Sequence, residues 1–179
     1  MHSDVEPWLR GPIADVHPAL QPVLHSFTQV REDLERFTAD LSTEQVWRSA
    51  GAVPPLGFQL RHMAGSVERL VTYLCGEQLS EQQIATLKAE ATPGAPLEEL
   101  LDGVRASLDQ AAARVRAIAP DSLYEPRYVG KKRMPTTVIG LLVHVAEHTQ
   151  RHLGQAITTA KLVRGLREKN TEDRIRKSE

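Results

Sequence analysis

Residues 144–155, His-Val-Ala-Glu-His-Thr-Gln-Arg-His-Leu-Gly-Gln, lie inside a pattern of apolar residues that has the period of an α-helix. The pattern advances in alternating steps of four and three residues, as in a helix of a bundle. Its apolar members are Leu141, Val145, Thr159, Leu162 and Leu166. Positions 148, 152 and 155 fall on the same seam, so the sequence predicts that two histidines and a glutamine face the interior.

The two histidines, His148 and His152, are four residues apart. On an α-helix this spacing places both side chains on one face, with Cβ atoms about 5–6 Å apart, so two imidazoles can bind one divalent ion. A core that needed only packing would have leucine or isoleucine here, because a buried polar atom without a partner costs about 1–3 kcal/mol. The pair therefore indicates a metal site whose third ligand comes from another helix.

The composition of the 179-residue chain argues against several kinds of partner. The 22 basic and 23 acidic residues nearly balance, which disfavours binding to nucleic acid or to an anionic membrane. Cys75 is the only cysteine, so an intramolecular disulfide and a thiolate zinc site are excluded. No apolar segment resembles a signal peptide or a membrane span. We expect a cytoplasmic protein with a small-molecule substrate.

Hydrophobic periodicity predicts long helices at about residues 18–41, 56–75, 96–120 and 136–167. Capping-box sequences at 42–45 and 80–83 predict short connecting helices. No run of alternating β-branched residues predicts a strand. The expected fold is all-α, a left-handed four-helix bundle with short connecting helices. We expect the domain to span residues 1–168, followed by a charged C-terminal tail at 169–179 that is a frayed helix or solvated.

His62 is the strongest candidate for the third ligand, because it adjoins the apolar residue Met63 on the second predicted helix. Periodicity places it at the rim of the core. His144, one turn before His148, is the alternative. However, imidazoles at 144, 148 and 152 would span about 12 Å of helix axis, too far for one ion, so His144 is expected beside the site or in the pocket wall.

The residues alone leave a simpler interpretation open: His148 and His152 are core histidines hydrogen-bonded to carbonyl groups or to Gln155. Gln155 itself could orient a bound water or be a buried amide. Glu147 adjoins His148 but points about 100° away on the helix, so it is either a surface charge or an acceptor near the ligands.

Two strings resemble the DinB-like (YfiT-like) family of metal-binding four-helix bundles: Leu-Arg-His-Met-Ala-Gly-Ser at 60–66 and the histidine string at 144–155. The resemblance implies one divalent metal ion, zinc or nickel, bound by His62, His148 and His152. Members of the family include thiol-dependent transferases and isomerases, together with many proteins described only as hydrolases. A low-molecular-weight thiol is therefore a second cofactor that the resemblance implies.

These observations predict a metal-dependent enzyme in which three histidines hold an ion that activates a thiol or water for attack on a small electrophile. The alternative is a non-catalytic metal-binding structural or stress-response bundle, a homodimer joined through an exposed helix face. The loop at 124–135 is rich in cations, and Arg127 or Lys131 could bind an anionic substrate there. A di-iron oxidase and a zincin-type protease are excluded, because the Glu-x-x-His and His-Glu-x-x-His motifs are absent.

Overall fold

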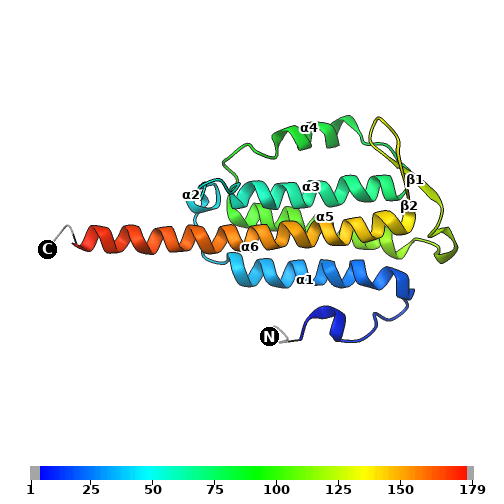
Figure 1. The fold of residues 1–179 in the computed structure, drawn as a ribbon, viewed down its shortest axis with the longest axis horizontal. Coiled ribbons are helices and arrows are strands. Elements are labelled where there is room, and N and C mark those ends of the chain that lie inside the picture. Colours follow the sequence, from blue (N-terminus) through cyan, green and yellow to red (C-terminus); the bar gives the residue numbers. More distant parts are fainter. Residues whose placement is uncertain (1–4, 177–179) are drawn as a thin grey trace.

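The computed structural model describes the backbone of residues 5–176 and the side chains of residues 5–166. Four long helices form a bundle (Figure 1). They are α1 (Gln21–Thr38), α3 (Leu56–Leu74), α5 (Leu97–Arg116) and α6 (Val138–Arg176). The predicted all-α four-helix bundle is thus confirmed. None of the described helices combines the length and the apolar character needed to cross a bilayer.

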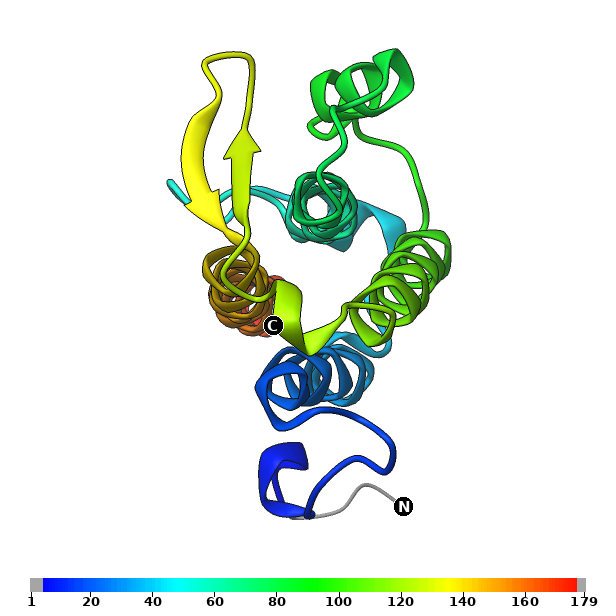
Figure 2. The ribbon, with the colours of Figure 1, turned by 90° about the vertical axis from the view of Figure 1, so that its right-hand side faces the viewer.

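The order of the helices around the bundle decides which faces meet. Figure 2 shows the bundle along its axis: α6 lies between α1 and α3, and α5 lies opposite α6, also between α3 and α1. Helices α1 and α6 run in one direction, whereas α3 and α5 run in the other (Figure 1). Because α3 and α6 are antiparallel neighbours, residues from the N-terminal half of α3 lie beside the middle of α6.

Short elements connect the long helices. Helix α2 (Thr43–Val46) and helix α4 (Glu81–Ala89) each begin with a capping box, made by Ser42 with Gln45 and by Ser80 with Gln83. Both capping boxes agree with the sequence prediction. Single 3₁₀ turns occur at Pro7–Leu9, Pro18–Leu20 and Pro120–Ser122. Helix α4 lies on the outer side of α3, and none of its residues is buried (Figure 2).

The core is a continuous apolar interior to which every long helix contributes one stripe. Its most deeply buried members, all shielded almost completely from solvent, include Phe27, Val30, Leu56, Leu60, Met63, Leu108, Val115 and Val145. Burial of apolar side chains on this scale is the main source of stability for a bundle. The same stripes fix the rotation of each helix and so decide which polar residues lie at its edges.

The buried stripe of α6 agrees only in part with the predicted seam. Gln155, Leu162 and Leu166 are exposed, and His148 and His152 are half-buried at the edge that faces α3. Leu141, Val145 and Thr159 of the predicted seam are buried, and the buried stripe also contains residues that the seam did not include: Leu142, Thr149, Leu153, Ala156, Ala160 and Val163. Apolarity alone misses part of this stripe, because small residues allow close helix packing and the Thr149 hydroxyl donates to the Val145 carbonyl at 2.6 Å.

A β-hairpin lies where no strand was predicted. Strands β1 (Pro126–Val129) and β2 (Met134–Thr137) pair antiparallel, with Arg127 opposite Thr136. The strands are too short to show alternation, and each contains a proline, which disfavours a strand. Helix α6 also continues to Arg176, beyond the expected end at about 167 (Figure 1). Residues 177–179 of the predicted tail lie outside the described part of the chain.

Arg127 fastens the hairpin to the end of α3. Its Nε donates to the Leu74 carbonyl at 2.8 Å, and its Nη1 donates to the Pro126 carbonyl at 2.9 Å. Leu74 is twelve residues beyond His62, which corresponds to about 18 Å along the helix. Lys131 is exposed in the hairpin turn. The structure therefore does not bring Arg127 to the histidines, and its contacts are those of a structural clamp.

Replacing the clamp should affect stability without affecting the histidine site. We expect Arg127→Met to lower the free energy of unfolding by about 1 kcal/mol, because the Leu74 carbonyl loses its side-chain donor. Lys131→Met, at an exposed position of the same hairpin, is the matched control and should leave stability unchanged. Urea unfolding followed by circular dichroism measures both. Equal stabilities of the two variants would show that the Arg127 contacts contribute nothing.

Candidate metal centre

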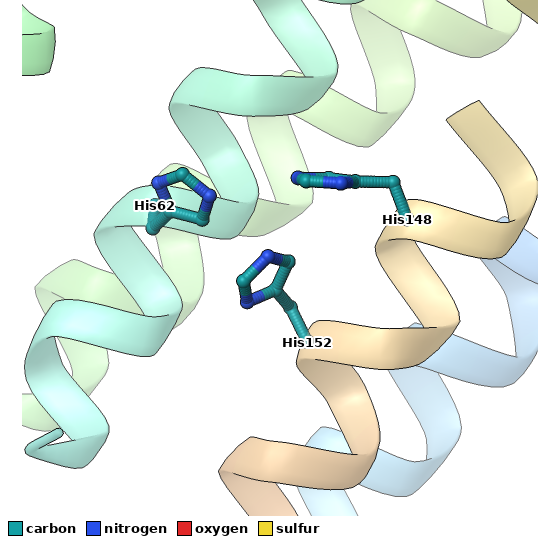
Figure 3. Close-up of side chains that lie close together, drawn as sticks. All are labelled: His62, His148 and His152. Atoms are coloured by element: carbon teal, nitrogen blue, oxygen red, sulfur yellow. The ribbon is translucent and has the colours of Figure 1, made fainter. Parts of the chain in front are cut away.

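Three histidines converge between two helices. His62 projects from α3, and His148 and His152 project from α6, one turn apart (Figure 3). One ligand nitrogen from each residue lies within 4.8 Å of the other two. His144 is not part of this group. Among the described residues, these three histidines could hold a metal ion.

The rings pack closely enough to restrict one another. The ring centroids of His62 and His152 are 4.4 Å apart, and those of His148 and His152 are 4.6 Å apart. Phe58, one turn before His62, stacks on the His62 ring at 5.6 Å with an interplanar angle of 14°. Helix packing and this stack therefore place the three rings before any ligand binds.

Two of the imidazoles have their Nδ1 atoms occupied by acceptors. Nδ1 of His62 lies 2.7 Å from Oε2 of Glu90, and Nδ1 of His152 lies 2.9 Å from Oε1 of Gln59. An Nδ1–H that donates to an oxygen leaves Nε2 unprotonated in a neutral ring, which is the form that binds a metal. Glu90 and Gln59 therefore favour the metal-binding tautomer.

His148 has no such partner. Both of its ring nitrogens are buried, and neither has a hydrogen-bond partner among the described residues. An unsatisfied buried polar group costs about 1–3 kcal/mol, so buried polar groups normally have a partner. A divalent ion between the three rings would supply the missing partner. The three imidazole donors fit a divalent transition-metal ion, and imidazole suits zinc, nickel, copper and iron alike.

Burial and neighbouring positive charges keep the α6 imidazoles neutral. Burial, followed by the charges of His62 and His148, lowers the pKa of His152 to about 4, although Gln155 acts in the opposite direction through a hydrogen bond. Burial also lowers the pKa of His148, assisted by His144. Both rings are thus unprotonated near neutral pH, as metal ligation requires.

Glu90 is a residue of the site that the sequence did not single out. It follows the last turn of α4, and its Oε1 forms an ion pair with Nη1 of Arg69 at 2.8 Å. Burial would raise the pKa of Glu90, but hydrogen bonds from His62 and Arg69 outweigh that effect and lower it. No spacing in the sequence connects Glu90 with His62. Gln59, by contrast, precedes His62 by three residues, so helical spacing could have identified it.

The other residues proposed near the site lie on its solvent side. His144 is exposed, and its Nδ1 lies 2.7 Å from Oε1 of Glu147. Glu147 also pairs with Arg151, so each of its carboxylate oxygens has a partner on α6 outside the three-histidine group. The ring of His144 is 5.3 Å from that of His148, centroid to centroid. Gln155 is exposed beside His152.

Comparison with known proteins places this bundle in a family. By its fold and site, the protein is a four-helix bundle with a candidate three-histidine metal centre. Residues 26–156 match the model of the DinB superfamily. This match covers more than half of the sequence, so the chain belongs to the DinB superfamily. No curated protein matches the sequence.

A solved structure shares the fold. It is described as the conserved protein of locus from Enterococcus faecalis, and its chain is 18% identical to this one with a TM-score of 0.66. The match covers 80% of this chain and 95% of that chain. At this level of identity the likeness concerns the fold alone.

Gly65 leaves the space that Glu90 and Arg69 occupy. A Cβ atom at position 65 would lie 2.6 Å from Nη1 of Arg69 and 2.7 Å from Oε1 of Glu90. Gly154, on the exposed side of α6, has no atom within 4 Å of such a Cβ. The absence of a side chain at position 65 therefore makes room for the Glu90–Arg69 ion pair, whereas a side chain at position 154 would meet no neighbouring atom.

Alanine at these two positions should have opposite effects on stability. Gly154→Ala should raise the melting temperature, because alanine in a helix is favoured over glycine by about 0.5–1 kcal/mol. Gly65→Ala should lower it, because displacement of a packed group costs about 1–3 kcal/mol. Thermal unfolding monitored by circular dichroism compares them. A Gly65→Ala protein as stable as Gly154→Ala would mean that the ion pair moves aside without cost.

Proposed function

We propose that this protein is a metal-dependent enzyme that uses one divalent ion on His62, His148 and His152 to activate a low-molecular-weight thiol or water for attack on a small electrophile. The observation that supports it most is that one ligand nitrogen from each of the three rings lies within 4.8 Å of the others, while neither nitrogen of His148 has a hydrogen-bond partner among the described residues. Family membership adds support, because the matched region contains all three histidines.

The donor set favours catalysis over a closed structural site. Three neutral imidazoles leave an ion its full charge and an open position, where it can lower the pKa of a bound water to about 7 or stabilise a thiolate. A structural zinc site usually has four protein ligands. Among the described residues, no fourth acidic or cysteine ligand joins the three histidines.

The side chains at the edge of the site supply the surroundings for a substrate. Phe58 provides an aromatic surface against His62, and the exposed His144 and Gln155 lie along the same edge of α6. The His62 side chain retains 22% of its surface exposed, so a small molecule can approach the rings from solvent. The aromatic surface would contact the apolar part of a substrate, while His144 and Gln155 offer polar groups to its reacting end.

Removing one predicted ligand should remove the metal. Protein purified without a nickel column should contain about one divalent ion per chain, and His148→Ala should lose it because two imidazoles bind far more weakly than three. His144→Ala is the matched control and should retain the ion. Elemental analysis by mass spectrometry measures all three proteins. If His148→Ala kept the ion and His144→Ala lost it, the metal ligands proposed here would be wrong, because the ion would then depend on His144 and not on His148.

A thiol should bind the ion directly if the protein activates thiols. Cobalt(II) provides a visible spectrum, and glutathione or 2-mercaptoethanol should add a sulfur-to-cobalt charge-transfer band. The experiment uses Cys75→Ser, so that the only thiol is the added one. An unchanged spectrum would contradict thiol activation and leave activation of water as the remaining form of the proposal. An unchanged spectrum without metal-dependent turnover of esters or other electrophiles would favour the structural or stress-response bundle instead.

A further inference from the structure

Helix α4 stands off from the bundle. None of its residues is buried, and a cleft of about 730 Å³ lies between α3, α4 and α5. The walls of the cleft include the small residues Ala64, Gly65, Ala85 and Ala89, together with Glu90. Because none of the α4 side chains is fully buried, polar contacts at its two ends help to hold the helix in position.

The first end is held by a side-chain hydrogen bond to α3. Nε2 of Gln83 donates to Oγ1 of Thr72 at 2.8 Å. The second end is held by Arg61, whose Nη1 contacts the carbonyls of Ala89, at 3.4 Å, and Thr92. The Arg61 guanidinium also lies over the Trp47 ring, 4.9 Å from its centroid. Arg61 therefore holds the main chain on both sides of Glu90.

Glu90 is the one side chain that this segment inserts deeply. The residue is only 3% exposed, and its carboxylate lies between His62 and Arg69. One oxygen faces Nδ1 of His62, while the other faces the guanidinium. Because Arg69 balances the buried negative charge, the carboxylate can stay beside the imidazole in its ionised form.

We propose that Glu90 is a positioning residue for His62, and that α4 controls the metal affinity of the site through this contact. The inference rests on the proposed metal site. A carboxylate that accepts a hydrogen bond from Nδ1–H fixes the tautomer and orientation of a histidine and makes its other nitrogen a better donor. A displacement of α4, or occupation of the cleft beneath it, would then alter the metal site without any contact with the metal.

The main test compares zinc affinity in matched carboxylate variants. Glu90→Gln keeps the size of the side chain but removes its charge, so we expect the dissociation constant for zinc to rise about 10–100-fold. Glu99→Gln, on the cleft wall of α5, removes an exposed charge without touching His62 and should bind zinc as the unmodified protein does. Competition with a chromophoric chelator measures the three constants.

A second measurement does not require the metal. The ¹⁵N chemical shifts of the His62 ring in metal-free protein report which nitrogen carries the proton. We expect Nδ1–H in the unmodified protein and in Glu99→Gln, and a larger share of Nε2–H in Glu90→Gln. A merely structural role for Glu90 would change thermal stability but leave this tautomer unaltered.

A further variant allows the test to be made even if the Glu90→Gln protein does not fold. Arg61→Gln releases the main chain around Glu90 without changing the buried carboxylate, and should weaken zinc binding by more than twofold but less than Glu90→Gln does. The inference is overturned if folded Glu90→Gln, or Arg61→Gln in its place, binds zinc within twofold of the unmodified protein while His62→Ala does not bind. If the unmodified protein binds no zinc, the proposed function fails as well, whatever tautomer His62 adopts.

Discussion

The antiparallel contact between α3 and α6 is the constraint on which the rest of the site depends. Apolar stripes on both helices fix their rotation, and the edges that meet beside those stripes are polar. Gln59 and His62 on one helix then lie against His148 and His152 on the other. A rotation of either helix by one residue, about 100°, would separate these rings. The apolar core thus sets the geometry of the imidazoles.

The cost of so many polar groups at a helix interface is offset by specific partners. Gln59 is almost completely buried, and it satisfies one nitrogen of His152. Glu90 and Arg69 form a buried ion pair that extends to His62. Removing one member of such a pair leaves an uncompensated charge, which is far more costly than losing a surface salt bridge. Of the three histidines, His148 is the one without a hydrogen-bond partner among the described residues, and its ring faces those of His62 and His152.

Hydrophobic periodicity predicted the bundle because a long helix repeats its signal over many turns. The capping boxes at Ser42 and Ser80 were equally clear, since a cap is a local interaction between near neighbours. The hairpin was missed because its strands are too short to show a period and depend on Arg127, which reaches a distant helix end. The stripe of α6 was predicted only in part: Leu141, Val145 and Thr159 are buried as expected, but Thr149 and the alanines are buried by close packing, whereas Leu162 and Leu166 remain exposed.

The sequence by itself determined the long helices and the position of His148 and His152 on one face, because residues four apart on an α-helix always lie on the same side. It also suggested His62, through its neighbour Met63. The tertiary structure alone decided that His62 reaches the other two rings, that Glu90 and Gln59 hold their Nδ1 atoms, and that Arg127 does not approach them. Those contacts join residues 28 to 93 positions apart, and no local pattern specifies which helix edges will meet.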